Sequence, residues 1–468
     1  MMELERNFGE QGSKKHRSLE RMRGLSRMDG HVGNEALFWP LASLNVLLGL
    51  YFVERWLLRP RVLEWIGAES SRNFGVPDLY VLAYFLLMFF SPGGKDAILR
   101  VVKFFGPMLL LYFAGGWGST FVGAGMGSPD FSRSFWASAQ ISFCFLILGP
   151  VLLNASERTG FRRAVLSYAS WIGIGGLLSV TDRLGVTNLG NQEYYRLENV
   201  LLGVNGFYVV GLLVPLLLYL LTQAIGRGQS PLAALIVAIL VFSHLGLALA
   251  GVRTGLILAG FGWTVGMWVC VRYGEWRRIK APGYIVGVGL VAIAAGLLVG
   301  TAAGREIFSF EIFLKRSEVT QGLFADDDRF FVYNLAWTDL IYKGAWLLGN
   351  GVNQWVIVHP NLEVIHNVFL LAWWEGGLLG FAGWALIYIR PAARLFLGAL
   401  GRGGTTPDRG LIWGAGFCIA GTAIGGLAYP IGYSRSDWLW FIIAVTPVLL
   451  HRVPRTSQGH PAKPFLDD

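Results

Sequence analysis

The chain has 468 residues, of which 54% are hydrophobic and 15% are charged. Its mean hydropathy of +0.50 excludes an ordinary soluble domain, because a soluble fold could not bury that much apolar surface. The formal net charge of +9 comes from short basic clusters between apolar runs. That pattern is typical of membrane orientation and argues against a nucleic-acid-binding face.

The N-terminal residues are polar and basic, without the apolar stretch and cleavage site of a signal peptide, so we expect a retained first anchor. A hydrocarbon core of ~30 Å requires roughly 20 apolar residues per helix. Scanning with that length predicts an all-α polytopic membrane protein with about twelve transmembrane helices, in a range of ten to twelve because two segments are short. The predicted segments are Ala36–Val53, Val76–Phe90, Val101–Phe113, Phe135–Leu153, Ala164–Val180, Gly206–Leu221, Pro231–Leu249, Gly255–Val271, Tyr284–Val299, Val368–Ile389, Leu411–Leu427 and Trp438–Leu450.

Lys and Arg accumulate in alternate connections, and the positive-inside rule then predicts that both termini are cytoplasmic. The connection before the tenth segment is a long periplasmic loop, and apolar and aromatic residues at helical spacing from Arg329 to Tyr342 predict that it is partly helical. The predicted organisation is a cytoplasmic tail (1–35), helices one to nine (36–302), the periplasmic loop (303–365), helices ten to twelve (366–450) and a second cytoplasmic tail (451–468).

Arg253 lies in a tight outward turn between two strongly apolar segments. A cation at that depth is costly unless it is paired or used. Two interpretations stay open: an arginine that reaches to the interface with its charged end, or an arginine that binds an anion at the mouth of a cavity. Orientation alone would not place a basic residue on the outward side, which favours the second interpretation.

Arg329 follows three consecutive aspartates, Asp326 to Asp328. Consecutive side chains diverge on most backbones, so these aspartates are expected to begin a loop helix rather than to hold a metal ion. Arg329 could pair with them. A metal site is accordingly not predicted here, and no cofactor is expected.

His366 and Asn367 lie where the long loop meets an apolar segment. An imidazole, with an ordinary pKa of ~6.5, suits a general base, although many such histidines are merely interfacial. Glu375 lies about two turns into that segment and must face protein or water, because a carboxylate in lipid is costly.

Together these features resemble the O-antigen ligase and O-antigen polymerase family of bacterial membrane glycosyltransferases. The resemblance covers the second half of the chain in detail and the first half only as a number of crossings. The residues that carry it are Val252-Arg253-Thr254-Gly255, Arg329 with Trp337, Gly349-Asn350-Gly351, His366-Asn367-Val368-Phe369-Leu370 and Glu375-Gly376-Gly377-Leu378-Leu379-Gly380. The chain departs from the family at Val252, where a serine is common, so no hydroxyl role is expected there.

The resemblance implies metal-independent transfer of a glycan from undecaprenyl diphosphate at the periplasmic face of the bacterial inner membrane. By position, Arg253 and Arg329 would bind the donor diphosphate and His366 would be the catalytic base. Arg196, Asn205, Asn367 and Glu375 are possible supporting residues. Arginine suits the diphosphate because its planar guanidinium stays charged and matches phosphate oxygens.

Three functions remain open at this stage. A polysaccharide polymerase of surface-glycan or exopolysaccharide biosynthesis is slightly favoured, because no acceptor-specific motif is visible. A ligase would instead transfer the glycan to the lipid A core of lipopolysaccharide, and a relative transfers it to protein. A lipid-linked glycan transporter would show paired halves with matching broken helices, and the sequence has no such symmetry. The expected partners are the lipid-linked donor, the glycan or lipid A core acceptor, and membrane lipids, with no nucleic acid.

Overall fold

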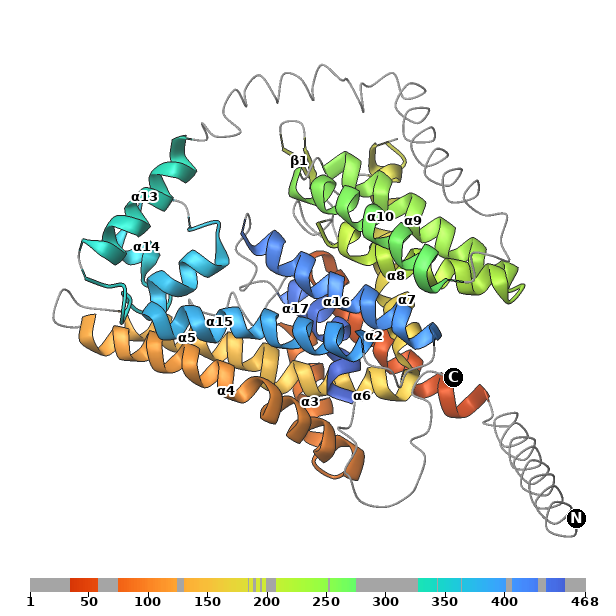
Figure 1. The fold of residues 1–468 in the computed structure, drawn as a ribbon, viewed down its shortest axis with the longest axis horizontal. Coiled ribbons are helices and arrows are strands. Elements are labelled where there is room, and N and C mark those ends of the chain that lie inside the picture. The colour runs from red at the N-terminus through yellow and green to blue at the C-terminus, as the bar shows by residue number, and fades with distance from the viewer. Residues whose placement is uncertain are drawn as a thin grey trace, which may run out of the picture.

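In the computed structural model the protein is a bundle of helices (Figure 1). The described residues are 34–57, 75–123, 130–183, 185–187, 191–193, 196–198, 208–250, 253–274, 327–342, 344–362, 364–400, 406–427 and 435–450. The predicted ninth segment, Tyr284–Val299, most of the first predicted tail and all of the second lie outside them.

The helices follow the predicted apolar segments closely in most places. In chain order they are α2 (Asn34–Leu57), α3 (Val76–Met88), α4 (Pro92–Gly123), α5 (Phe131–Ser142), the π-helix η4 (Phe143–Leu148), α6 (Gly149–Thr159), α7 (Phe161–Arg183), α8 (Val209–Gly226), α9 (Ser230–Ala250), α10 (Arg253–Tyr273), α13 (Asp327–Ile341), α14 (Trp355–Val358), α15 (Val368–Leu400), α16 (Thr406–Gly426) and α17 (Arg435–Leu450). The described β-structure is one antiparallel hairpin, β1 (Asn191–Glu193) with β2 (Arg196–Glu198).

Seven helices within the described residues are long and apolar enough to cross a membrane, and three shorter apolar helices accompany them. The predicted class of helical membrane protein is therefore confirmed in its coarse form. The predicted count of about twelve crossings stays a prediction.

Three predicted segments had the wrong extent or continuity. The third was expected over Val101–Phe113, but α4 continues from Pro92 to Gly123. The fourth consists of α5, η4 and α6 in succession, and the tenth, α15, is interrupted at Gly377. A hydropathy window measures apolar length, so it detects neither polar helix ends nor a change of backbone direction inside an apolar run.

The helices pack through small residues. A Cβ on Gly383 would lie 2.6 Å from the Met108 carbonyl oxygen of α4, and one on Gly211 of α8 would meet the backbone of Leu258 in α10. Such glycines let helix backbones approach closely where lipid supplies no hydrophobic driving force between helices. Figure 1 shows the two resulting groups, with α4 along α15 and with α8, α9 and α10 together.

Basic residues gather at one end of the bundle, which we call the basic end. The Arg390 guanidinium donates to the Phe104 carbonyl at 2.9 Å, and the Arg394 guanidinium lies 5.0 Å from the centre of the Phe104 ring. Arg100 forms an ion pair with Glu157 at 2.6 Å. The start of α4, the end of α6 and the later part of α15 therefore meet at this end.

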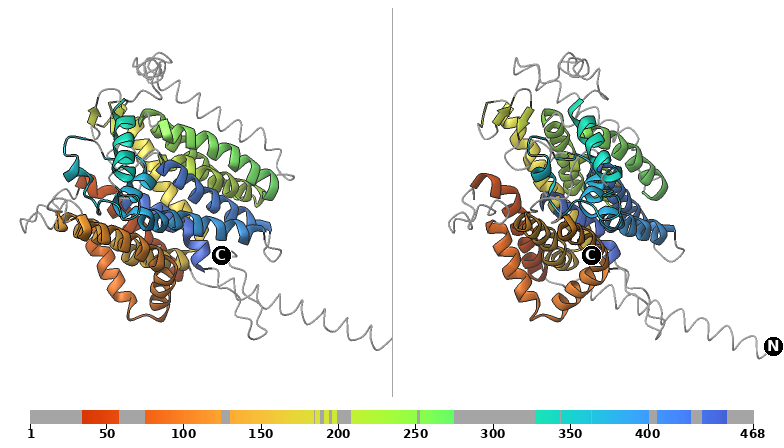
Figure 2. Two further views of the ribbon diagram at one scale, coloured as in Figure 1. Left: turned by 60° about the vertical axis from the view of Figure 1, so that its left-hand side comes forward. Right: turned by 90° about the vertical axis from the view of Figure 1, so that its left-hand side faces the viewer.

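The opposite end, which we call the loop end, carries α13, α14 and the loop between α13 and α15 (Figures 1 and 2). In Figure 2, right, the view faces this end and α13 lies in front. The structure thus separates the basic helix ends from the segment that the sequence predicted to be outward.

Candidate functional site

The central feature of the loop end is the interruption of α15. Gly377 has φ +58° and ψ −153°, which is not helical, and only glycine adopts this backbone conformation without strain. A Cβ on Gly380 would lie 2.6 Å from the Ala372 carbonyl oxygen, although a straight helix separates these residues by ~12 Å along its axis. The first part of α15 (368–376) therefore folds back against its second part (378–400).

The Gly349-Asn350-Gly351 turn supplies hydrogen-bond partners to the backbone at this break. The Asn350 N–H donates to the Trp374 carbonyl at 2.7 Å, and the Gly351 N–H donates to the Glu375 carbonyl at 2.9 Å. From the other side of the break, the Leu378 N–H donates to the Leu347 carbonyl at 3.1 Å. A helix end within the bundle needs such partners because unsatisfied backbone groups are costly there.

Glu375 is buried at the same break. One carboxylate oxygen accepts a hydrogen bond from the Tyr112 hydroxyl of α4 at 2.6 Å, and the other accepts from the Asn353 N–H at 2.9 Å. The carboxylate thus joins α4, the loop and α15. Glu375 is one of the predicted supporting residues. Protein donors hold both oxygens of its carboxylate, as expected for a residue that positions others.

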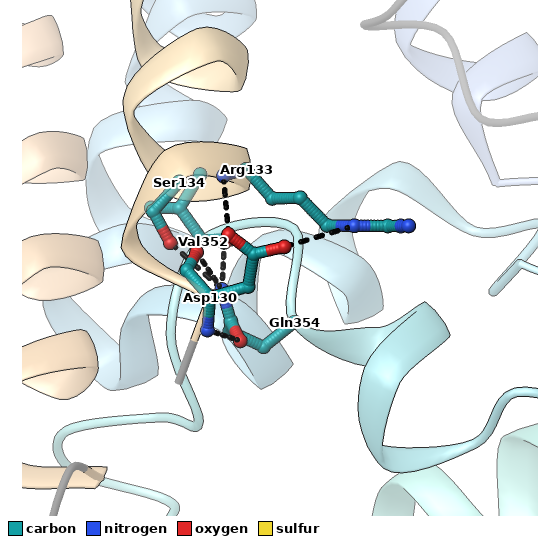
Figure 3. A network of polar contacts seen from close by, with 5 residues as sticks. All are labelled: Asp130, Arg133, Ser134, Val352 and Gln354. Carbon is teal, nitrogen blue, oxygen red and sulfur yellow. Dashed lines mark hydrogen bonds and ion pairs between the residues drawn. The ribbon is translucent and has the colours of Figure 1, made fainter. Parts of the chain in front are cut away.

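A second set of polar contacts fastens the loop to the start of α5 (Figure 3). The Gln354 amide nitrogen donates to the Asp130 carbonyl at 3.0 Å and to the Ser134 hydroxyl at 2.9 Å, and its oxygen accepts from the Asp130 N–H at 3.1 Å. The Ser134 hydroxyl donates to the Val352 carbonyl at 2.7 Å. Asp130 also caps α5 by accepting from the Arg133 N–H at 3.0 Å, and it pairs with the Arg133 guanidinium at 3.3 Å.

His366 is half-buried and lies two residues before Val368, the first residue of α15. Asn367 explains why the helix begins there, because its side-chain oxygen accepts from the N–H groups of Phe369 and Leu370, each at 3.0 Å. This is the usual N-cap arrangement. The positive end of the helix dipole lies beside His366 and favours negative charge nearby.

A small core separate from the transmembrane core supports this region. Its buried apolar residues are Val332, Ala336, Leu340, Ala345, Trp355, Ile365, Leu371 and Trp374. They come from α13, the loop, α14 and the first part of α15. The helix that contains Arg329 therefore packs against the segment that ends in His366.

One ionisable pair lies in this small core. The buried Asp339 carboxylate of α13 accepts from the Trp374 indole N–H at 3.0 Å, and the same oxygen lies 2.9 Å from the His359 Nε2 atom. The His359 ring also packs on Trp355, with 4.3 Å between ring centres. Asp339 was not among the predicted site residues, although a carboxylate between apolar residues of an amphipathic helix is a signal for a buried polar role.

The two arginines are placed by their backbones only. Arg253 is the first residue of α10 and Arg329 lies in the first turn of α13, and their side chains lie outside the described residues. Arg196 belongs to β2, again without a described side chain, and Asn205 lies outside the described residues. The aspartate run before Arg329 is likewise outside the described side chains.

Helix packing nevertheless relates the starts of α10 and α15. A Cβ on Gly255 of α10 would lie 3.1 Å from the Cα of Tyr208, just before α8, and one on Gly421 of α16 would lie 2.5 Å from the Leu212 side chain of α8. At the end of α16, a Cβ on Gly426 would lie 2.8 Å from the Val368 side chain. The two helix starts therefore share the loop end of the bundle.

No family model matches this chain, and no curated protein matches it either. The class that the fold defines is a helical membrane protein, with a broken helix and a compact loop body at one end.

Proposed function

We propose that this protein transfers or polymerises undecaprenyl diphosphate-linked glycan at the periplasmic face of the inner membrane. One observation supports this most: motifs that lie apart in the sequence form one connected assembly. Asn367 caps α15 beside His366, the Gly349-Asn350-Gly351 turn closes the break in that helix, and Glu375 fastens it. These contacts fix the helix start that follows His366, and a catalytic base needs such a fixed setting.

In this proposal His366 accepts the proton of the acceptor hydroxyl. The hydroxyl oxygen then bonds to the anomeric carbon of the donor glycan, while the bond from that carbon to the phosphate oxygen breaks. Undecaprenyl diphosphate leaves with the bonding electrons. Arg253 and Arg329 bind the diphosphate and stabilise the charge that develops on it, and the reaction uses no metal ion.

Polymerase activity is the first choice, and ligation to a lipid A core is the alternative within the same chemistry. One observation favours a third function, a transporter of lipid-linked glycan. The broken α15 resembles the discontinuous helices of transporters. Transporters pair such helices across two halves, and among the described helices only α15 has a non-helical residue inside, so transfer remains preferred.

The test uses purified His366→Ala with a defined lipid-linked donor and acceptor. Loss of the base is expected to slow transfer by roughly 10²- to 10⁴-fold, while binding of the lipid diphosphate survives. Wild-type activity should fall as acidification protonates the imidazole, and EDTA should have little effect.

His460→Ala, in the predicted cytoplasmic tail, is the matched control and should keep wild-type activity. Wild-type rates in His366→Ala would remove this histidine from the mechanism. Loss of wild-type activity in EDTA would instead indicate that the aspartates before Arg329 bind a metal ion.

A further inference from the structure

The loop end carries a continuous apolar surface of exposed and half-buried side chains, which we call the aromatic ridge. It joins α13, the loop and both parts of α15. The Trp337 ring packs on Trp373 at 5.3 Å between centres, and Trp373 packs on Phe381 at 5.5 Å. The Trp373 indole N–H donates to the Trp346 carbonyl at 2.8 Å. The members of the ridge are Trp337, Trp346, Leu347, Leu348, Trp373 and Phe381.

This ridge is unusual for a loop region that would stand free in water. Four of its side chains, Trp337, Trp346, Leu347 and Leu348, are between 41% and 50% exposed. A contiguous exposed apolar patch marks an interaction site rather than an ordinary aqueous surface. The interior of the same body is a small apolar core with the buried contact of Asp339 with His359. The ridge is therefore an apolar outer face on a body that already has its own core.

The ridge is continuous with membrane-facing surface. Leu378 and Leu379 begin the second part of α15 with 44% and 43% of their surfaces exposed, and this helix belongs to a candidate membrane span. These leucines adjoin the ridge directly, because the Leu378 N–H donates to the carbonyl of Leu347, a member of the ridge. Lipid in contact with these exposed leucines of α15 would therefore also lie beside the aromatic ridge.

The tryptophans of the ridge indicate the depth at which it would lie in a membrane. Tryptophan is enriched at the boundary between acyl chains and headgroups, where an amphipathic ring has one apolar and one polar neighbourhood. We infer that the aromatic ridge lies in the membrane interface at the loop end and that its partner is the lipid bilayer itself. The loop body thus rests on the membrane and does not extend into the aqueous phase.

This inference stands independently of the proposed function and also deepens it. A lipid-linked donor carries its diphosphate at headgroup level, directly below its sugar. The same small core that underlies the ridge packs against the segment ending in His366. Docking of the ridge would hold that segment at the level of the donor diphosphate.

The test is a depth measurement on the full-length protein in phosphatidylcholine and phosphatidylglycerol nanodiscs. A spin label is attached to Leu348→Cys and, in a second variant, to Leu347→Cys. Asn361→Cys, an exposed polar position of the same loop, is the matched aqueous control. The native cysteines are buried, and the protein without an added cysteine reports any background labelling.

Labels on the ridge should collide several-fold more often with oxygen than with a nickel chelate, relative to the label at position 361. Oxygen concentrates in lipid and the chelate stays in water. The inference is overturned if both ridge labels match the control. It is also overturned if they are shielded from both reagents, because the ridge is then covered by protein, including a second copy of the chain. The measurement uses no donor or acceptor, so its result is separate from the transferase assay.

Discussion

Removal of the Glu375 carboxylate should release the loop from the broken helix. In Glu375→Leu, the buried Tyr112 hydroxyl and the Asn353 N–H both lose their acceptor. Each unsatisfied donor costs about 1–3 kcal/mol, so the local loss is about 2–6 kcal/mol. Tyr112→Phe removes a single bond to a charged acceptor, worth about 1.5–3 kcal/mol. Glu375→Gln should be mild because its amide can accept from the N–H and donate to the tyrosine oxygen.

The assay is hydrogen exchange of the peptide that covers residues 347–354, measured in nanodiscs. At 1.4 kcal/mol per tenfold change, Tyr112→Phe should speed its exchange by about 10- to 100-fold, and Glu375→Leu should speed it further. In the double variant, Tyr112→Phe should add no further loss and should slow the exchange relative to Glu375→Leu alone, because phenylalanine leaves no buried hydroxyl without an acceptor. Additive effects, or unchanged exchange in Glu375→Leu, would show that this carboxylate does not hold the loop.

Three further predictions follow from the site and the topology. Arg253→Lys and Arg329→Lys should insert normally but lose most transfer activity, because lysine keeps the charge without the planar fork; near-normal turnover would indicate simple charge attraction. Asp339→Leu should increase protease cleavage of the loop body, because two donors lose their acceptor at about 1–3 kcal/mol each; unchanged cleavage would contradict this. Reporter fusions should place both chain termini in the cytoplasm, and opposite locations would exclude an even number of crossings.

Apolar length and composition determined the class of this protein and most of its helices. The segment predicted over Pro231–Leu249 is α9 over Ser230–Ala250, because an apolar run bounded by polar residues is sufficient to define such a helix. The start of α15 was equally accessible, since His366-Asn367 precedes a long apolar run and asparagine is a preferred N-cap. These features depend on residues close together in the chain.

Tertiary structure alone decided how the candidate site is built. The break at Gly377 depends on a loop whose carbonyl and N–H groups replace the missing helical partners. The partner of Glu375 is Tyr112, 263 residues away in the sequence, and the acceptor for Trp374 is a carboxylate on α13. No local pattern encodes these pairings, because a buried polar group is satisfied by whichever donor or acceptor the packed helices bring beside it.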